Sequence, residues 1–162
     1  MWIRDALPSA CPAIRFVLFG YNSKLAESNS SQTATDLASF LAENLKASGL
    51  ASPAAKPLIF LAHSLGGIVL KEALDRDHQH MRHVAGAIFF GVPSRGMKTD
   101  ALMTVVSGQP NEGLVYDLTT ASEYLQRLDD RFFEVARRGR MELFWAYETK
   151  TTPTVVVSIN LP

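Results

Sequence analysis

The stretch "PLIFLAHSLGGIVLKEAL", residues 57–74, places an apolar strand directly before a helix. Its first half is a continuous apolar run typical of a buried strand, and residues 66–76 have helical spacing. Between them stands A-H-S-L-G, which matches the pattern G-x-S-x-G with alanine at the first position. In a strand–turn–helix context this pattern forms a sharp turn, the nucleophile elbow, that exposes the serine hydroxyl. Ser64 is therefore our candidate nucleophile.

The residues around Ser64 fit such a turn. We define the elbow as residues 62–66, in which Ala62, His63 and Gly66 surround Ser64 and Leu65. The turn needs small residues two positions before and two after the serine, and alanine meets this need at the first of them. The backbone N–H of Leu65, at the start of the following helix, is our candidate donor to a developing oxyanion.

This stretch has two other interpretations. Serine is a favoured helix N-cap, so Ser64 could simply cap the helix that follows it. A phosphate-binding loop needs G-x-x-x-x-G-K-[ST], but Lys71 is not preceded by glycine and Glu72 follows it. No G-x-G-x-x-G is present either, so the elbow is favoured and no nucleotide cofactor is expected.

The rest of the chain alternates apolar strands with helices. We predict helices at 33–49, with Thr33 and Asp36 as a capping box, and at 119–139, with Thr120 and Glu123 as another. Residues 94–117 have no clean period and are predicted to form a loop or lid-like insertion. Further strands are predicted at residues 14–21, 56–63, 83–93, 141–148 and 153–160. This order predicts a mostly parallel sheet covered on both faces, with ligands bound beyond the carboxyl ends of its strands.

Composition and charge favour a globular domain and argue against nucleic-acid-binding and membrane-spanning proteins. The 162 residues, 47% hydrophobic and 20% charged, suit one globular domain, and 16 basic residues balance 16 acidic ones. No excess of charge points to nucleic acid, and no apolar run is long enough to span a membrane. Cys11 is the only cysteine, which weakly favours a reducing, cytoplasmic compartment.

Four motifs in order resemble the serine esterase or lipase-like α/β-hydrolase domain of fungi, a relative of the serine-active-site-containing proteins. They are residues 1–25, "LAHSLGGIVLKEAL" (61–74), "GAIFFGVPSRGM" (86–97) and "FWAYET" (144–149). The resemblance implies a partial α/β-hydrolase fold, a Ser–acid–His triad and an ester or lipid ester substrate. It also implies that signalling modules of the NACHT or NB-ARC class, with ankyrin or tetratricopeptide repeats, follow the domain in full-length relatives. The strands at 14–21, 56–63, 83–93, 141–148 and 153–160 correspond to strands four to eight of that fold.

The resemblance places the triad acid at Glu148 and the histidine after residue 160. The four histidines, however, are His63, His78, His80 and His83. The last three read as a solvated linker rather than a metal site. The family's His-Gly loop, a second oxyanion donor, precedes the segment that begins here at Trp2. We therefore expect a domain truncated at both ends and inactive by itself, since an unactivated serine is a poor nucleophile.

Three functions remain open at this point. The chain is a serine hydrolase domain by descent, a non-catalytic recognition module of a signalling protein, or an acyltransferase that uses the same elbow.

Overall fold

A computed structural model describes residues 5–24, 26–52, 54–79, 82–120 and 122–147. Within them a three-stranded sheet has the order β1 (Leu58–His63), β2 (Val84–Phe90), β3 (Glu142–Ala146). Both strand pairs are parallel. The helices are α2 (Leu7–Ala10), α3 (Ala34–Ala47), α4 (Leu65–Arg76), α5 (Asp100–Val106), α6 (Glu112–Tyr116) and α7 (Glu123–Gly139). The predicted parallel α/β sheet, with strands at 56–63, 83–93 and 141–148, is confirmed.

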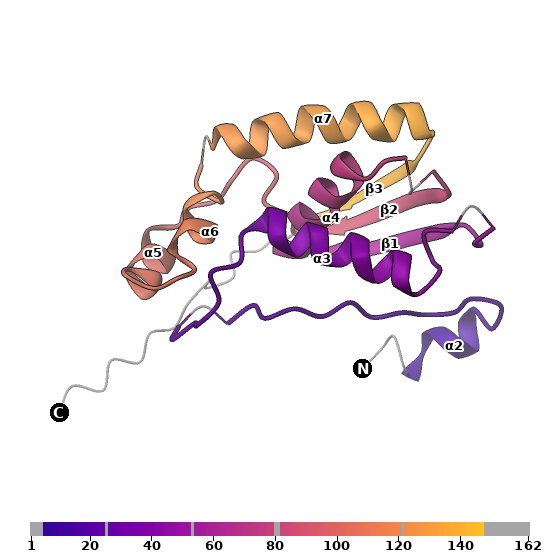
Figure 1. Cartoon of the computed structure of the whole chain (residues 1–162), viewed down its shortest axis with the longest axis horizontal. Coiled ribbons are helices and arrows are strands. Elements are labelled where there is room, and N and C mark those ends of the chain that lie inside the picture. The colour runs from indigo at the N-terminus through magenta and orange to yellow at the C-terminus, as the bar shows by residue number, and fades with distance from the viewer. Residues whose placement is uncertain (1–4, 25, 53, 80–81, 121, 148–162) are drawn as a thin grey trace.

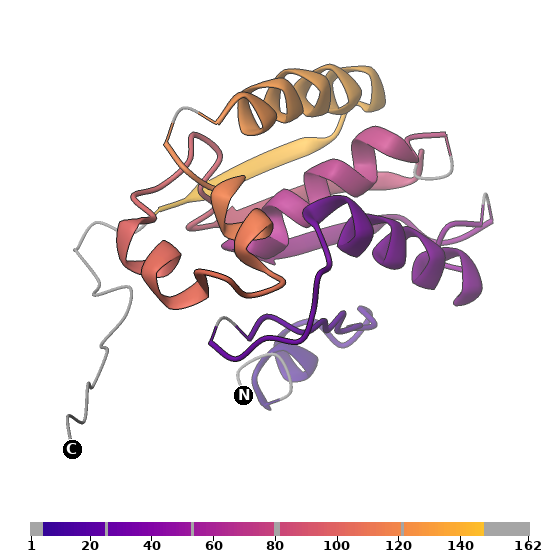
Figure 2. The same cartoon turned by 60° about the vertical axis from the view of Figure 1, so that its left-hand side comes forward.

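The three long helices lie side by side on one face of the sheet, with α4 between α3 and α7 (Figures 1 and 2). The register puts Ala62, Phe89 and Trp145 in one row across the strands. Phe89 is fully buried there and packs edge-on against Phe132 of α7, with ring centroids 5.6 Å apart. This side of the sheet therefore holds the main core.

The opposite face of the sheet is open in the described part of the chain. The neighbouring row of Leu61, Ile88 and Phe144 points to this face, where Leu61 is 46% and Phe144 60% exposed. The sequence predicts a sheet covered on both faces; within the described residues the three long helices cover one face, and Leu61 and Phe144 are exposed on the other.

Helix α3 begins as the sequence predicts. The Thr33 hydroxyl accepts a hydrogen bond from the Asp36 N–H, and the Asp36 carboxylate accepts one from the Thr33 N–H, so the capping box is complete. The predicted box of Thr120 and Glu123 is wrong. Helix α7 begins two residues later than that box requires, and Ser122 is its N-cap, with its hydroxyl accepting from the Leu125 N–H at 3.4 Å.

The prediction of a buried strand at 14–21 is also wrong. These residues are not part of any strand, and Ile14, Val17 and Leu18 are 54–65% exposed. Phe19 is an exception, because its ring lies 5.6 Å from that of Phe40 on α3. A strand needs a neighbour to pair its backbone groups, and no described strand adjoins this segment on the sheet.

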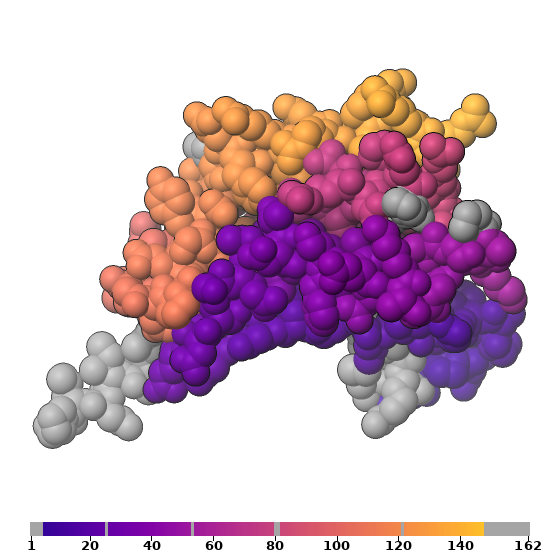
Figure 3. Space-filling view, in the orientation of Figure 1, coloured from indigo at the N-terminus to yellow at the C-terminus, as the bar shows by residue number. Residues whose placement is uncertain are grey.

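Residues 94–117, predicted to form a loop or lid-like insertion, contain the two short helices α5 and α6. Leu102, Val106 and Val115 from α5 and α6 form a small apolar cluster of their own. This unit projects at one end of the molecule, next to the start of α3 (Figure 3). An isolated pairing of Met97 with Thr119 joins the start and end of the insertion. The predicted strand at 153–160 lies outside the described residues. Within the described ranges no helix is long and apolar enough to cross a membrane.

Candidate functional site at the carboxyl edge of the sheet

The chain turns from β1 into α4 at a single residue, Ser64. Its backbone angles are φ 50° and ψ −127°, a conformation that residues with a side chain rarely adopt. Two hydrogen bonds hold the turn, from the Ser64 N–H to the Phe90 carbonyl and from the Gly67 N–H to the Ser64 carbonyl, both 2.9 Å. Strain of this kind concentrates at functional sites, where the surrounding structure holds it in place.

The hydroxyl of Ser64 does not cap helix α4. Ser64 stands at the N-cap position, but its side chain accepts no hydrogen bond from the first turn. Ser122, at the same position of α7, does accept such a bond. The helix-cap interpretation of Ser64 therefore fails, and its half-buried hydroxyl remains available at the carboxyl edge of the sheet.

The glycine that this turn needs most is Gly67 rather than Gly66. A Cβ on Gly67 would stand 2.7 Å from Cγ1 of Val92, which lies in the loop after β2. A Cβ on Gly66 would meet only the hydroxyl of Tyr21, at 3.7 Å. The requirement for a small residue thus comes from the loop that packs on α4, which the local motif does not reveal. Ala62, at the other predicted small position, is buried.

The first turn of α4 supplies N–H groups beside Ser64. The first N–H groups of a helix have no intrahelical acceptor, and the Ser64 side chain accepts no hydrogen bond from those of α4. Leu65, which follows Ser64 in the chain, carries the first of these N–H groups. Together with the positive end of the helix dipole it can stabilise an oxygen that gains negative charge.

The structure does not bring a histidine onto Ser64 within its described part. His63 is exposed at the end of β1. His78 and His83 lie at the other end of the strands, where His78 Nδ1 is 3.3 Å from the Asp75 carbonyl and His83 Nε2 contacts the Leu50 carbonyl. His80 and Glu148 lie outside the described residues. No group of His, Cys, Asp and Glu suited to a metal ion is found among the residues described.

A buried lysine behind the elbow was not singled out from sequence. Lys71 of α4 is fully buried, with Nζ 2.6 Å from the Ser94 hydroxyl and 2.5 Å from the Asp129 carboxylate of α7. Its ammonium also lies over three aromatic rings, 4.7 Å from Trp145, 5.5 Å from Phe89 and 5.6 Å from Phe132. Burial lowers the pKa of Lys71, although the bond to Asp129 opposes this. The cluster ties α4 to α7 and to the loop that carries Val92.

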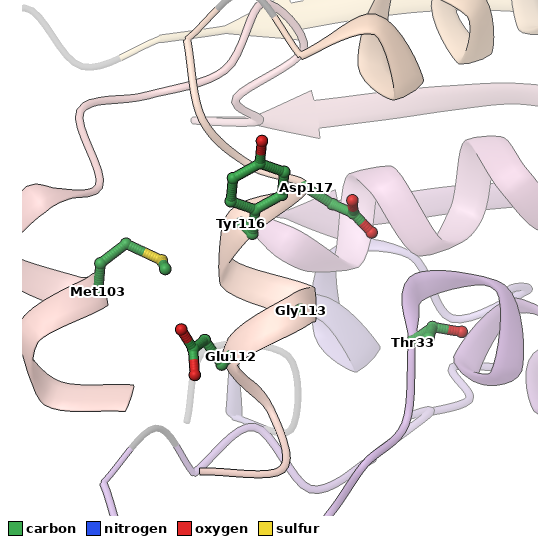
Figure 4. A pocket seen from close by; sticks show the side chains of 6 residues that line it. All are labelled: Thr33, Met103, Glu112, Gly113, Tyr116 and Asp117. Carbon is green, nitrogen blue, oxygen red and sulfur yellow. The ribbon is translucent and has the colours of Figure 1, made fainter. Parts of the chain in front are cut away.

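A pocket in the described part of the chain lies away from the elbow. It has a volume of about 460 Å³ and is lined by residues of α5, α6 and the start of α3: Thr33, Met103, Glu112, Gly113, Tyr116 and Asp117 (Figure 4). Burial raises the pKa of Asp117. Since no elbow residue lines this cavity, geometry at Ser64 rather than cavity size identifies the candidate site.

This fold is a partial α/β-hydrolase fold, and solved structures resemble it. One is a lipase of Bacillus licheniformis, BlEst2 in mature form, with a TM-score of 0.52 and 23% identity over 70% of this chain and 47% of that one. Another is the phospholipase PlaB from Legionella pneumophila in complex with thio-NAD, with a TM-score of 0.63 and 13% identity over 79% of this chain and 28% of that one.

The chain also resembles longer proteins in sequence. It is similar to Protein SERAC1 of Mus musculus, 23% identical over 93% of the chain, and of Bos taurus, 26% identical over the same share. The chain spans about a quarter of the length of these relatives, 24% in each case. No family model matches it.

Proposed function

We propose that Ser64 is the nucleophile of a serine hydrolase domain that acts on esters. One observation carries the proposal: a serine at positive φ between a parallel strand and a helix, whose hydroxyl is not used as a helix cap. A serine that served only the fold would have no reason to keep this strained conformation with an uncommitted hydroxyl.

In this reaction the Ser64 Oγ attacks the ester carbonyl carbon while its proton passes to a base. The carbonyl oxygen becomes an oxyanion that accepts from the Leu65 N–H, and the alcohol then leaves with a proton. Water releases the acyl group in a second attack. The base in such triads is a histidine, and Glu148 is our proposed acid to orient it.

Lipid esters are the favoured substrate class. The structures that resemble this fold are named as a lipase and a phospholipase, and this supports the choice for the present chain. The open apolar face of the sheet, with Leu61 and Phe144 exposed, is compatible with a lipid-facing domain. An acyltransferase using Ser64 would share every step except the acceptor, which would be an alcohol in place of water.

Fluorophosphonate labelling tests the nucleophile. We expect one adduct on Ser64, detected by intact mass and peptide mapping, that is absent from Ser64→Ala. Because no described histidine bonds to Ser64, added imidazole should accelerate the labelling by acting as an external base. Ser122→Ala is the matched control, since Ser122 is also a helix N-cap, and it should label normally. A folded chain that gains no adduct at Ser64 even with imidazole contradicts the proposal.

A second function rests on the absence of a base among the described histidines. A recognition module of a larger signalling protein would keep the fold without the chemistry. In that case a partner would bind equally well to the parent chain and to Ser64→Ala, and the chain would release no alcohol from any ester. Release of alcohol that Ser64→Ala abolishes would decide for the hydrolase.

A further inference from the structure

The side chain of Tyr21 lies over the first turn of α4. Apart from the neighbouring residues and backbone of α4 itself, its hydroxyl is the heavy atom that an added Cβ on Gly66 would approach within 4 Å, at 3.7 Å. Asn22 and Ser23, which follow Tyr21 in the chain, line a small cavity together with Leu65 of α4. Residues 21–23 therefore lie beside the first turn of α4.

The Tyr21 ring is held by packing, whereas its hydroxyl has no hydrogen-bond partner among the described residues. The ring packs on the main core and lies 5.9 Å from the ring of Phe19. The hydroxyl forms no hydrogen bond with any residue that the structure describes. Burial raises the pKa of Tyr21, so near neutral pH the phenol keeps its proton and can donate it to a ligand.

An oxyanion needs more than one donor. Removal of a single donor from such sites typically slows the reaction by about 10² to 10³, because the developing charge is otherwise unmatched. The Leu65 N–H is one donor at the elbow. The Tyr21 phenol is the side-chain O–H that the described structure brings to the same helix turn. Glycine at position 66 keeps the space between the phenol and the turn free of a side chain.

We propose that Tyr21 is an oxyanion donor of this site, and that its phenol hydrogen-bonds to the carbonyl oxygen of an ester held at Ser64. This inference rests on the proposed function, because it assigns a role to Tyr21 only if Ser64 is the residue that becomes acylated. A tyrosine that merely filled the core would serve equally well as phenylalanine.

The test uses a trapped acyl group, so that it does not depend on turnover. In a Cys11→Ser background, Ser64→Cys introduces the sole thiol of the chain. Carbonyl-labelled 4-nitrophenyl acetate then forms a thioester at residue 64 and releases 4-nitrophenol. Isotope-edited infrared spectroscopy reports the hydrogen bonds of that carbonyl, since each donated bond lowers its stretching frequency. The matched controls are Tyr116→Phe, which removes an exposed phenol, and Tyr124→Phe, whose hydroxyl donates to Glu72.

Tyr21→Phe should raise the carbonyl frequency, and neither control should change it. The same substitution should slow fluorophosphonate labelling of the Ser64 parent about 100-fold. If Tyr21→Phe unfolds, 3-fluorotyrosine incorporated into the chain strengthens the phenol as a donor, and the frequency should then fall. An unchanged frequency in these measurements overturns the role of Tyr21 and leaves Ser64 as nucleophile. A thiol at residue 64 that is not acylated, in a folded chain, overturns the proposed function and this inference together.

Discussion

Removing the carboxylate of Asp129 should destabilise the protein more than removing the ammonium of Lys71. The two groups are 2.5 Å apart, but they are not equally buried, since the Lys71 side chain is inaccessible and that of Asp129 is 22% exposed. Asp129→Asn leaves an ammonium in the core without its counter-charge. Lys71→Met leaves a carboxylate that water can reach.

The structure gives approximate sizes to these two effects. Breaking a buried ion pair from one side typically destabilises by about 3–5 kcal/mol, whereas an apolar replacement is often close to neutral. We therefore expect a loss of roughly 3 kcal/mol for Asp129→Asn and within about 1 kcal/mol for Lys71→Met. Methionine suits the site because its sulfur can occupy the space between the three rings around Lys71. The double variant should resemble Lys71→Met and be more stable than Asp129→Asn.

Urea denaturation followed by circular dichroism measures these differences. With a slope of about 2 kcal/mol per molar urea, a gap of about 2 kcal/mol moves the midpoint by about 1 M. Glu123→Gln is the control, because it removes one partner of an exposed pair with Arg127 on α7 and should cost less than about 1 kcal/mol. A loss for Lys71→Met equal to or above that for Asp129→Asn would refute this reasoning.

The pH dependence of the same variants gives an independent check. Burial lowers the pKa of Lys71 below 10.5, so its charged form is less favourable in the folded than in the unfolded chain. Stability should rise as the pH passes the folded-state pKa of Lys71, and the rise should end near 10.5. Tyr21 and Tyr124 act in the opposite sense above pH 10, because burial raises the pKa of both. The difference between the parent and Lys71→Met therefore isolates the contribution of the lysine.

Three further predictions concern the elbow and the helix that precedes it. Gly67→Ala should destabilise the protein by about 1–3 kcal/mol in denaturant titrations, because its Cβ would collide with Val92. Gly66→Ala should be neutral or slightly stabilising. Equal losses of stability for the two variants would contradict the packing argument. Ser64→Gly should stabilise the protein by about 1 kcal/mol relative to Ser64→Ala, because glycine tolerates positive φ, and an unchanged midpoint would argue against strain. Thr33→Ala should cost about 1 kcal/mol in thermal or urea unfolding, through loss of the cap of α3, and an unaltered transition would show that the cap adds nothing.

Local patterns in the sequence were enough to predict the three strands that form the sheet and the helices that cover it. Strand β1 and helix α4 fall within two residues of their predicted bounds, because apolar runs and helical spacing reflect burial along the chain. The same reasoning failed at residues 14–21. Hydrophobicity indicates that a segment avoids water, but it does not show whether a second strand is present to pair with it.

The start of α7 illustrates a related limit. Both Thr120 and Ser122 can cap a helix, and local sequence preferred Thr120 because Glu123 completes a box. The structure places the cap at Ser122, whose hydroxyl accepts a hydrogen bond from the Leu125 N–H. Leu125, Leu128 and Phe132 share one helix face for either starting residue, so the hydrophobic pattern alone does not choose between the two caps.

Part of the candidate site could be predicted from a local motif, and part depends on contacts between residues that are far apart in the sequence. Ser64 and Leu65 could be proposed from the sequence because the elbow is a contiguous motif of five residues. Tyr21 and Val92 come from other segments of the chain, and Lys71 lies further along α4; each matters only because of the residues that it contacts across the fold. The strained turn cannot persist alone, because a conformation that is unfavourable at Ser64 needs packing energy from elsewhere to hold it. Val92, which lies against Gly67 in the first turn of α4, is the contact nearest the turn and our candidate source of that energy.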